Sequence, residues 1–522
     1  MSSTIQPSVR SAMTSVQPLT LRQGQVIHGS IQKIFPDQRA EVQVGNTKMM
    51  AQLEVPLKAG DAHYFQVLGG KDALQLKVVT DALQPSTANS SHIKQLMDSL
   101  QLPKSTEMQG LVQQMVKEKI PLSKEQLLMA EQWLKEMPPH VKNSDGFLAI
   151  LKMTELKLDF TVENFRMLVS GQDKNGLTQL LDTLKQALQQ DSSMPFSQKV
   201  TLEDTLTQIA QPFAKELGGA IFGQVIERLN SNQTSLSDKT ILLNLLKEAG
   251  LVPKQATLAN WLNSINQSSR EERSASIGPP SDDKVFAQLS ELARKSNHLP
   301  IQQVLSAAEA TFHSGMNRVA IEQAMKQILG NIGFAYEAKI TQPDTNLSQL
   351  SDSLKPQLLA LLQKQTMSEP LRETAEMIIS RLNGMQILSG ENGPQHQLFM
   401  QVPLDILGKR MDATLQWNGR MKEDGKIDSN YARVMFYLDL ASLKETVIDM
   451  QVQNRVITIN IFNENDALFP YAEPFKEALK TGLSSLNYQL SGVFMKSTTK
   501  QPEPPAILTK NQSDRWGVDI LI

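Results

Sequence analysis

The clearest pattern of apolar and polar positions lies near the C-terminus of the chain. Apolar residues alternate with polar ones over residues 447–452 and again over residues 456–462, which is typical of strands that bury one face. A segment with apolar residues at helical spacing follows, and then a last strand-like run over residues 488–495. The pattern predicts a compact α+β module made of an antiparallel hairpin, one packed helix and a closing strand.

The short connection between the two alternating runs sets the register of the predicted hairpin. If Gln453 and Asn454 form a two-residue loop, Met450 faces Ile457 and the apolar residues of both strands share one face. The helix carries an apolar stripe that we expect to pack on the sheet. The residues of this stripe are Ala472, Phe475, Leu479, Leu483 and Leu486. Residues 384–417 are predicted as extra strands that precede this core.

A second group of strand patterns lies in residues 21–80. Turn signals separate five short runs, and Gly45-Asn46 between two alternating runs is a strong hairpin signal. The predicted strands span residues 25–35, 40–44, 47–55, 62–68 and 74–79. Five strands of this length and spacing predict a small closed or partly open β-barrel.

Between these regions the chain has a helical pattern. From residue 92 to about residue 383, apolar residues recur at three- and four-residue spacing. Two predicted helices begin alike, because Ser123 and Thr161 each precede an early Glu that suits a positive helix N-terminus. Polar and Pro-containing stretches separate the regions. The predicted organisation is a disordered N-terminus (1–20), the β-barrel (21–80), helical regions (92–263 and 285–383) joined by a disordered linker (264–284), a C-terminal α+β domain (384–496), a flexible linker (497–514) and a terminal strand (515–522).

A short motif stands at each end of the C-terminal module. It opens with Leu438-Asp439-Leu440-Ala441-Ser442-Leu443-Lys444 and ends with Leu486-Asn487-Tyr488-Gln489-Leu490. With two strands and a leucine-rich helix between these motifs, the module resembles the C-terminal domain of the flagellar hook-length control protein family, as in a paralogue of Gram-positive bacteria. Lys444 and Asn487 stand where that family usually has glycine. The residues that match the family core are Leu438, Leu440, Leu443, Val447, Ile457, Ile459, Leu479, Leu483, Leu486 and Leu490.

This resemblance implies a non-enzymatic regulator. Proteins of the family contact the cytoplasmic C-terminal domain of a flagellar or type III export-gate switch protein, and the contact changes which substrates are exported. We therefore expect that domain as the partner, bound by sheet and loop surfaces of the C-terminal module. A paralogue that kept the module and acts independently of the flagellum is the alternative.

Charge and composition argue against a nucleic-acid partner. The formal net charge is −2, and residues 21–80 hold seven Lys or Arg against five acidic residues. Aromatic residues make up only 5% of the chain, whereas binding of single strands needs a basic groove and stacking side chains. We expect no nucleic-acid partner, and a nucleic-acid-binding adaptor acting through the barrel is the second alternative.

The sequence contains no recognisable catalytic or metal-binding constellation. There is no cysteine, which removes disulfides, thiolate zinc sites and cysteine nucleophiles. The seven histidines are His28, His63, His92, His140, His298, His313 and His396. No two of them have the three- or four-residue spacing of a metal site on a helix. We expect no cofactor, no metal and no enzymatic activity.

The pattern of apolar residues also predicts where in the cell the protein is found. No stretch approaches the roughly 18 uninterrupted apolar residues of a membrane-spanning helix. Residues 1–20 are polar and lack the apolar core of a secretory signal. We expect a cytoplasmic protein without membrane insertion, whose polar N-terminus is also compatible with export through the flagellar apparatus. The predicted fold class is multidomain α+β, with an N-terminal β-barrel, a long helical middle region and a C-terminal α+β module.

Overall fold

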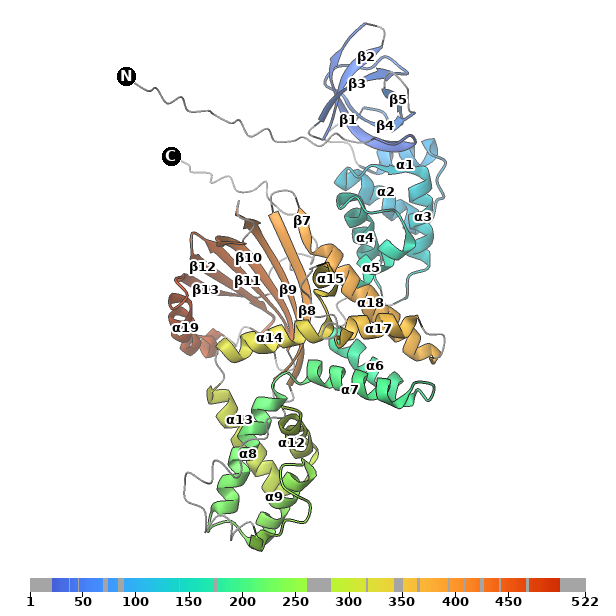
Figure 1. Ribbon diagram of the computed structural model, residues 1–522. Coiled ribbons are helices and arrows are strands. Elements are labelled where there is room, and N and C mark those ends of the chain that lie inside the picture. The colour runs from blue at the N-terminus through green and yellow to red at the C-terminus, as the bar shows by residue number, and fades with distance from the viewer. Residues whose placement is uncertain are drawn as a thin grey trace, which may run out of the picture. The chain divides into compact units, whose positions relative to one another are not determined.

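The computed structural model contains two compact units, one up to Val169 and one from Ser170 onward (Figure 1). The described residues are 21–36, 38–45, 47–68, 74–82, 89–139, 141–172, 176–260, 283–315, 318–341, 351–363, 367–392, 395–406, 409–422, 427–440, 443–465 and 469–497. The predicted N-terminal segment (1–20) and terminal strand (515–522) lie outside them. The two predicted linkers do so almost entirely, since Asp283 begins a helix and Ser497 ends a strand.

The first unit contains a closed ring of five strands. Their bounds are β1 (Gln25–Ile34), β2 (Arg39–Val44), β3 (Thr47–Leu53), β4 (Ala62–Val67) and β5 (Leu74–Val78). Antiparallel pairings join β1 to β2 and β4, β2 to β3, and β4 to β5, while a parallel pairing of β3 with β5 closes the ring. Ile31, Val42 and Phe65 belong to its fully buried interior. The predicted small N-terminal β-domain is confirmed.

Helices that follow the ring in sequence belong to the same unit. They are α1 (Asn89–Ser99), α2 (Thr106–Glu118), α3 (Lys124–Lys135) and α4 (Asn143–Glu155), and a short strand β6 (Leu122–Ser123) pairs with β1. The hydroxyl of Tyr64 donates to the carbonyl of Val116 at 2.9 Å, so α2 also contacts the ring. The predicted caps are confirmed, because Ser123 accepts a backbone hydrogen bond at the start of α3 and Thr161 does so at α5 (Val162–Gln172).

The second unit is built on a seven-stranded sheet, and α18 lies at one end of it and α19 at the other (Figure 1). The strands are β7 (Gly390–Asn392), β8 (Gln395–Ile406), β9 (Lys409–Met421), β10 (Ile427–Leu440), β11 (Lys444–Gln453), β12 (Val456–Asn463) and β13 (Gln489–Ser497). They lie in the order of the chain, and all pairings are antiparallel except that of β12 with β13. The α+β fold class is confirmed.

Helices from the middle of the sequence pack against the β8 end of this sheet. They are α6 (Leu177–Gln190), α7 (Phe196–Ala210), α14 (Arg318–Ile332) and α18 (Glu369–Leu388), with α15 (Tyr336–Ile340) and α17 (Leu354–Leu362) beside them. The start expected for the extra strands is wrong, because α18 continues through Gly384 to Leu388 and β7 begins only at Gly390. Sheet packing extends the helix here, since Ile378, Leu382 and Met385 are buried.

Two basic side chains are buried where these helices meet the sheet and one another. Arg381 of α18 is 1% exposed and donates to the side-chain oxygen of Gln401 on β8 at 2.6 Å. Lys355 of α17 is also 1% exposed, and its Nζ lies 2.6 Å from Gln386 Oε1 and 2.5 Å from Glu337 Oε1. Buried cations need such partners because their desolvation is costly.

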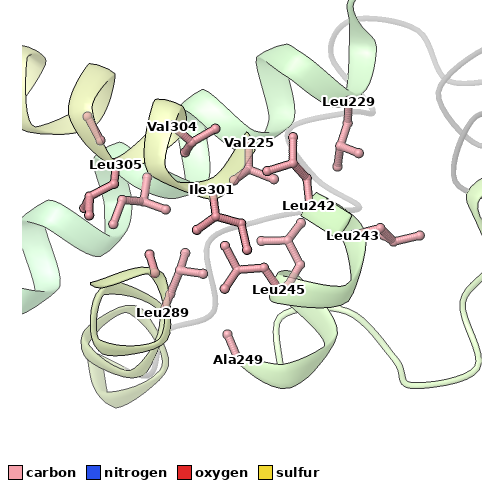
Figure 2. Packing of buried hydrophobic residues seen from close by; sticks show 14 of the residues in the cluster. Val225, Leu229, Leu242, Leu243, Leu245, Ala249, Leu289, Ile301, Val304 and Leu305 are labelled. Carbon is pink, nitrogen blue, oxygen red and sulfur yellow. The ribbon is translucent and has the colours of Figure 1, made fainter. Parts of the chain in front are cut away.

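Four further helices form a small bundle with its own core. These are α8 (Ala214–Asn230), α9 (Leu236–Glu248), α12 (Asp283–Lys295) and α13 (Leu299–Gly315). Figure 2 shows aliphatic side chains from all four meeting in the interior, among them Val225, Leu245, Leu289 and Ile301. Gly218 allows close packing of α8 and α12, because a Cβ there would lie 2.0 Å from the carbonyl oxygen of Phe286. In the part of the chain that the structure describes, no helix is long and apolar enough to cross a membrane.

Candidate functional site

The C-terminal module contains the predicted succession of hairpin, helix and closing strand. Strands β11 and β12 form the hairpin, α19 (Phe469–Ser484) follows, and β13 lies parallel to β12. The loop lies one residue later than predicted: it consists of Asn454 and Arg455, because Gln453 pairs with Val456 and Met450 pairs with Ile459. Each residue of β11 therefore pairs two positions further along β12 than predicted. Because side chains alternate between the two faces of a strand, this shift leaves the apolar residues on one face, as predicted.

The backbone of the loop explains the corrected register. Asn454 and Arg455 are its two central residues, with φ angles of 49° and 64°. Two successive left-handed residues are the requirement of the tight turn that matches the twist of a hairpin. Asn tolerates this conformation, and Arg455 is held in it by several contacts of its side chain.

Arg455 links the hairpin to the end of α19 and to the start of β10. Its guanidinium donates to Asn430 Oδ1 at 3.1 Å, to Ser429 Oγ at 3.2 Å and to the carbonyl of Asn487 at 3.3 Å, and lies 5.2 Å from the centre of the Tyr488 ring. A cation at the C-terminal end of a helix satisfies carbonyl groups that have no partner within the helix. The sequence pattern did not single out this residue, because its partners come from three separate segments.

Lys444 and Asn487, the two positions where the sequence departs from the motif that it was predicted to resemble, share one unusual feature. Lys444, the first residue of β11, has φ 56°, and Asn487, between α19 and β13, has φ 61°. Both are therefore in the left-handed region, which glycine adopts without steric cost and lysine adopts poorly. Both residues therefore have the backbone conformation that glycine favours.

Most residues of the predicted family core lie in the module's interior or at its margin. Val447, Ile457 and Ile459 are buried, and Leu483 and Leu490 pack against a cluster formed by Val452, Ile457 and Ile459. Leu438, Leu440, Leu443 and Leu486 are partly buried. The helix stripe was only partly predicted correctly. Phe475 is 72% exposed and therefore largely uncovered, and Leu479 is 37% exposed and only partly covered.

The face of the sheet away from α19 is mainly polar at this end. We call Arg433, Asp449, Asn460, Phe494 and Lys496 the polar face, because the strand register places them on the side opposite Ile459 and Val493. Arg433 donates two hydrogen bonds to Asp449, at 2.9 and 3.1 Å, which raise the pKa of the guanidinium. Phe494 is 52% exposed, and Lys496 Nζ lies 5.5 Å from the centre of the Phe462 ring. A half-exposed aromatic among fixed charges is typical of a surface that binds another protein.

The ring of the first unit has a separate exposed surface at the β1–β2 connection. Ile34 and Phe35 are 47% and 39% exposed, and Lys33 and Arg39 beside them are exposed. The connection is held by a hydrogen bond from the amide of Phe35 to the carbonyl of Arg39 at 2.7 Å. Apolar, aromatic and basic side chains therefore meet at one loop.

The described residues offer no metal-binding group of three or more His, Asp or Glu side chains. One partly buried histidine contacts an aromatic ring of the same unit. His28 packs edge-on against Tyr64 with ring centres 5.5 Å apart, and burial together with nearby Lys119 lowers the pKa of His28 to about 4. This arrangement is a packing contact within the ring.

Comparisons with known proteins match both the ring and the chain as a whole. A family model described as a TP0910 S1-like domain matches residues 4–77, which include the first four strands of the ring and most of β5. The chain is 24% identical over 529 aligned residues to the uncharacterised protein YlqG of Bacillus subtilis (strain 168). The alignment covers 92% of this chain and 90% of that relative. No solved structure matches.

Proposed function

We propose that this protein is a non-enzymatic regulator of the hook-length control type, whose C-terminal module binds the cytoplasmic C-terminal domain of an export-gate switch protein. The observation that carries the proposal is the left-handed backbone at Lys444 and Asn487. These are the two places where the family usually has glycine. A backbone conformation that glycine favours, present where the residue is not glycine, supports the resemblance independently of the hydrophobic pattern.

The polar face is the surface that we propose for this contact. It carries an exposed aromatic side chain, Phe494, half-exposed Asn460, and an ion pair in which Asp449 is buried while the Arg433 side chain is 45% exposed. The ring of Phe494 lies over the backbone of Gly492, where a Cβ would approach its Cζ atom to 2.9 Å. The strand therefore presents a pre-positioned aromatic, which loses little conformational freedom on binding.

A titration of the full chain with the purified switch-protein domain tests the proposal. We expect a transient complex with a Kd of about 1–100 µM, measured by calorimetry and by chemical-shift changes. Phe494→Ala should weaken binding by about tenfold, because exposed aromatics are frequent hot spots. Phe196→Ala is the matched control, since Phe196 in α7 is 82% exposed and lies outside the module. Absence of any shift at millimolar concentration would refute the partnership.

Deletion of the gene separates the two forms of this proposal. Abnormal hook length or loss of motility would support the flagellar role. Normal hooks, together with binding that Phe494→Ala weakens, would assign the protein to the flagellum-independent alternative.

A specific observation also favours the second alternative, binding of single-stranded nucleic acid by the ring. The S1-like match covers the ring, and Phe35 with Lys33 and Arg39 joins a stacking side chain to two cations at the β1–β2 loop. Small five-stranded barrels bind oligonucleotides at this loop and at the outer face of their second and third strands. The outer face here adds Lys48, which lies 3.3 Å from Glu41, and Met50, which is 49% exposed.

Fluorescence anisotropy with a labelled 12-nucleotide RNA tests this second function on the full chain. Phe35→Ala should weaken binding by about tenfold, because stacking on one base contributes about 1–3 kcal/mol. Val55→Ala is the control, at a residue that is 44% exposed in the connection after β3 of the same unit. Replacing Lys33 and Arg39 by Gln should reduce the slope of log Kd against log salt by about 1.4. If neither Phe35→Ala nor the replacement of Lys33 and Arg39 by Gln changed RNA binding, this loop would be excluded as the binding site.

A further inference from the structure

Strand β13 lies at one edge of the sheet of the second unit, and no other strand among the described residues pairs with its outer side. Among the described residues, β13 pairs with β12 alone. A register shift between the pairs of Leu490 and Gly492 interrupts the ladder once, and from Gly492 to Lys496 the strand pairs regularly and contains no proline. Such an edge is a template for a further strand, and proteins commonly cover or blunt it. We therefore expect another segment to cover the outer edge of β13.

Helix α19 has exposed apolar side chains near this edge. The helix packs chiefly on β13, and Leu483 reaches the apolar cluster that contains Leu490 and Val493. Phe475 and Leu479 continue the same stripe at four-residue spacing, yet they are 72% and 37% exposed. Since β12 and β13 are parallel, the helix between them runs back along the sheet. An added strand beside β13 would therefore lie within reach of this exposed part of the stripe.

One segment of the chain outside the described residues has the pattern that this place requires. Residues 515–522 alternate, with Trp516, Val518, Ile520 and Ile522 at every second position. Residues 498–514 connect them to the end of β13, and this length can span up to about 55 Å, more than the roughly 30 Å length of β13. Pro502, Pro504 and Pro505 cannot donate to a ladder, so pairing belongs to the part of the chain beyond them.

We propose that residues 515–522 pair with the outer edge of β13 as an eighth strand of the sheet, and that Trp516, Val518 and Ile520 cover Phe475 and Leu479. The occupant is this chain's own segment. It is tethered close to the edge, which raises its effective concentration to the millimolar range, and it is apolar where the uncovered stripe is apolar. Pairing would also remove the exposed edge that invites association with other chains. The inference is separate from the proposed function, since it concerns the edge and not the polar face.

Hydrogen exchange of the full chain and of a chain ending at Asp514 tests the proposal. In the full chain we expect slow exchange of the β13 amides that point away from β12, and at least tenfold faster exchange after truncation. A synthetic peptide of residues 513–522 added to the truncated chain should restore the protection. Equal exchange of β13 in both chains would overturn the proposal. So would protection that appears only at concentrations where light scattering shows a dimer, because the occupant would then come from a second copy.

Point variants give a matched pair on the segment itself. Ile520→Asp should abolish the protection of β13, because it places a charge against the apolar stripe of α19. Asp519→Asn lies at the alternate position and should leave the protection within twofold of the wild type. Phe475→Ala tests the other side of the contact and should increase β13 exchange several-fold. Protection that survives both Ile520→Asp and Phe475→Ala would contradict the proposed contact.

Discussion

At the scale of single residues, two non-glycine residues of the module have a backbone conformation that suits glycine. Lys444 and Asn487 are both left-handed, although only asparagine tolerates this region well. The register of β10–β11 begins with the pairing of Leu440 and Lys444, so this conformation is where the chain turns into β11. The free-energy cost of the left-handed conformation at Lys444 is offset by the packing of the hairpin and the helix that this turn positions.

We predict that Lys444→Gly raises the free energy of unfolding by about 0.5–1 kcal/mol. Relief of left-handed strain, about 1–2 kcal/mol, exceeds the entropy that glycine adds to the unfolded chain. Asn487→Gly should change it by less than about 0.5 kcal/mol, because asparagine has little strain to relieve. Denaturant unfolding of both variants, with Lys444→Ala as the control that keeps a Cβ, measures the difference. A gain for Lys444→Ala as large as that for glycine would contradict the strain argument.

A second residue-scale prediction concerns acid stability. Asp191, 5% exposed at the end of α6, accepts hydrogen bonds from the amides of Ser193 at 2.7 Å and of Ser368, at the start of α18, at 2.8 Å. Burial alone would raise the pKa of Asp191, but these hydrogen bonds outweigh it and hold the pKa well below its usual range. A depressed carboxyl pKa stabilises the fold above the unfolded value and loses that effect as pH falls.

Asp191→Asn should therefore lower Tm at pH 7, with a loss of about 1–3 kcal/mol. The difference in Tm between wild type and variant should shrink as the pH falls below the pKa of the unfolded aspartate, about 3.9, toward the lower folded value. Thermal melts of both proteins across this range provide the measurement. A difference that stays constant down to the lowest pH would show that the charge is not involved.

At the scale of elements, the β11–β12 hairpin depends on which face each residue occupies. Ile459 is 7% exposed and packs in the apolar cluster under α19, whereas neighbouring Asn460 is half-exposed on the polar face. Ile459→Asp should destabilise the unit by about 3 kcal/mol or more, because it buries a charge without a partner. Asn460→Asp should cost less than about 0.5 kcal/mol. Comparable losses in thermal melting would mean that the faces are assigned wrongly.

At the scale of the whole molecule, the chain divides into two compact units at Val169. The five-stranded ring has its own interior around Phe65, and the four-helix bundle has another around Ile221. Each unit therefore contains buried apolar side chains that do not depend on the other, which is the basis of independent folding.

We predict that core truncations act within one unit only. Phe65→Ala and Ile221→Ala should each cost about 3 kcal/mol through loss of apolar burial and creation of a cavity. Hydrogen exchange should become faster in residues 21–169 for the first variant and in residues 170–497 for the second. Faster exchange across both units after either substitution would show that they unfold together.

Local patterns in the sequence sufficed to predict much of the architecture. Period-two alternation located the strands of the ring and the hairpin, and Ser123 and Thr161 marked two helix starts. These features were predictable because strand faces and helix caps depend on neighbours within a few residues. A shift of two positions in the hairpin register left the buried face unchanged for the same reason.

Only the tertiary structure determined which distant surfaces meet. The parallel pairing of β3 with β5 closes the ring, and the packing of α18 on β8 buries Arg381 beside Gln401. The exposure of Phe475 and Leu479 was decided in the same way, because an amphipathic stripe specifies an apolar face without specifying what covers it. Long-range pairing depends on the shapes and partners of whole elements, and no local spacing in the sequence records them.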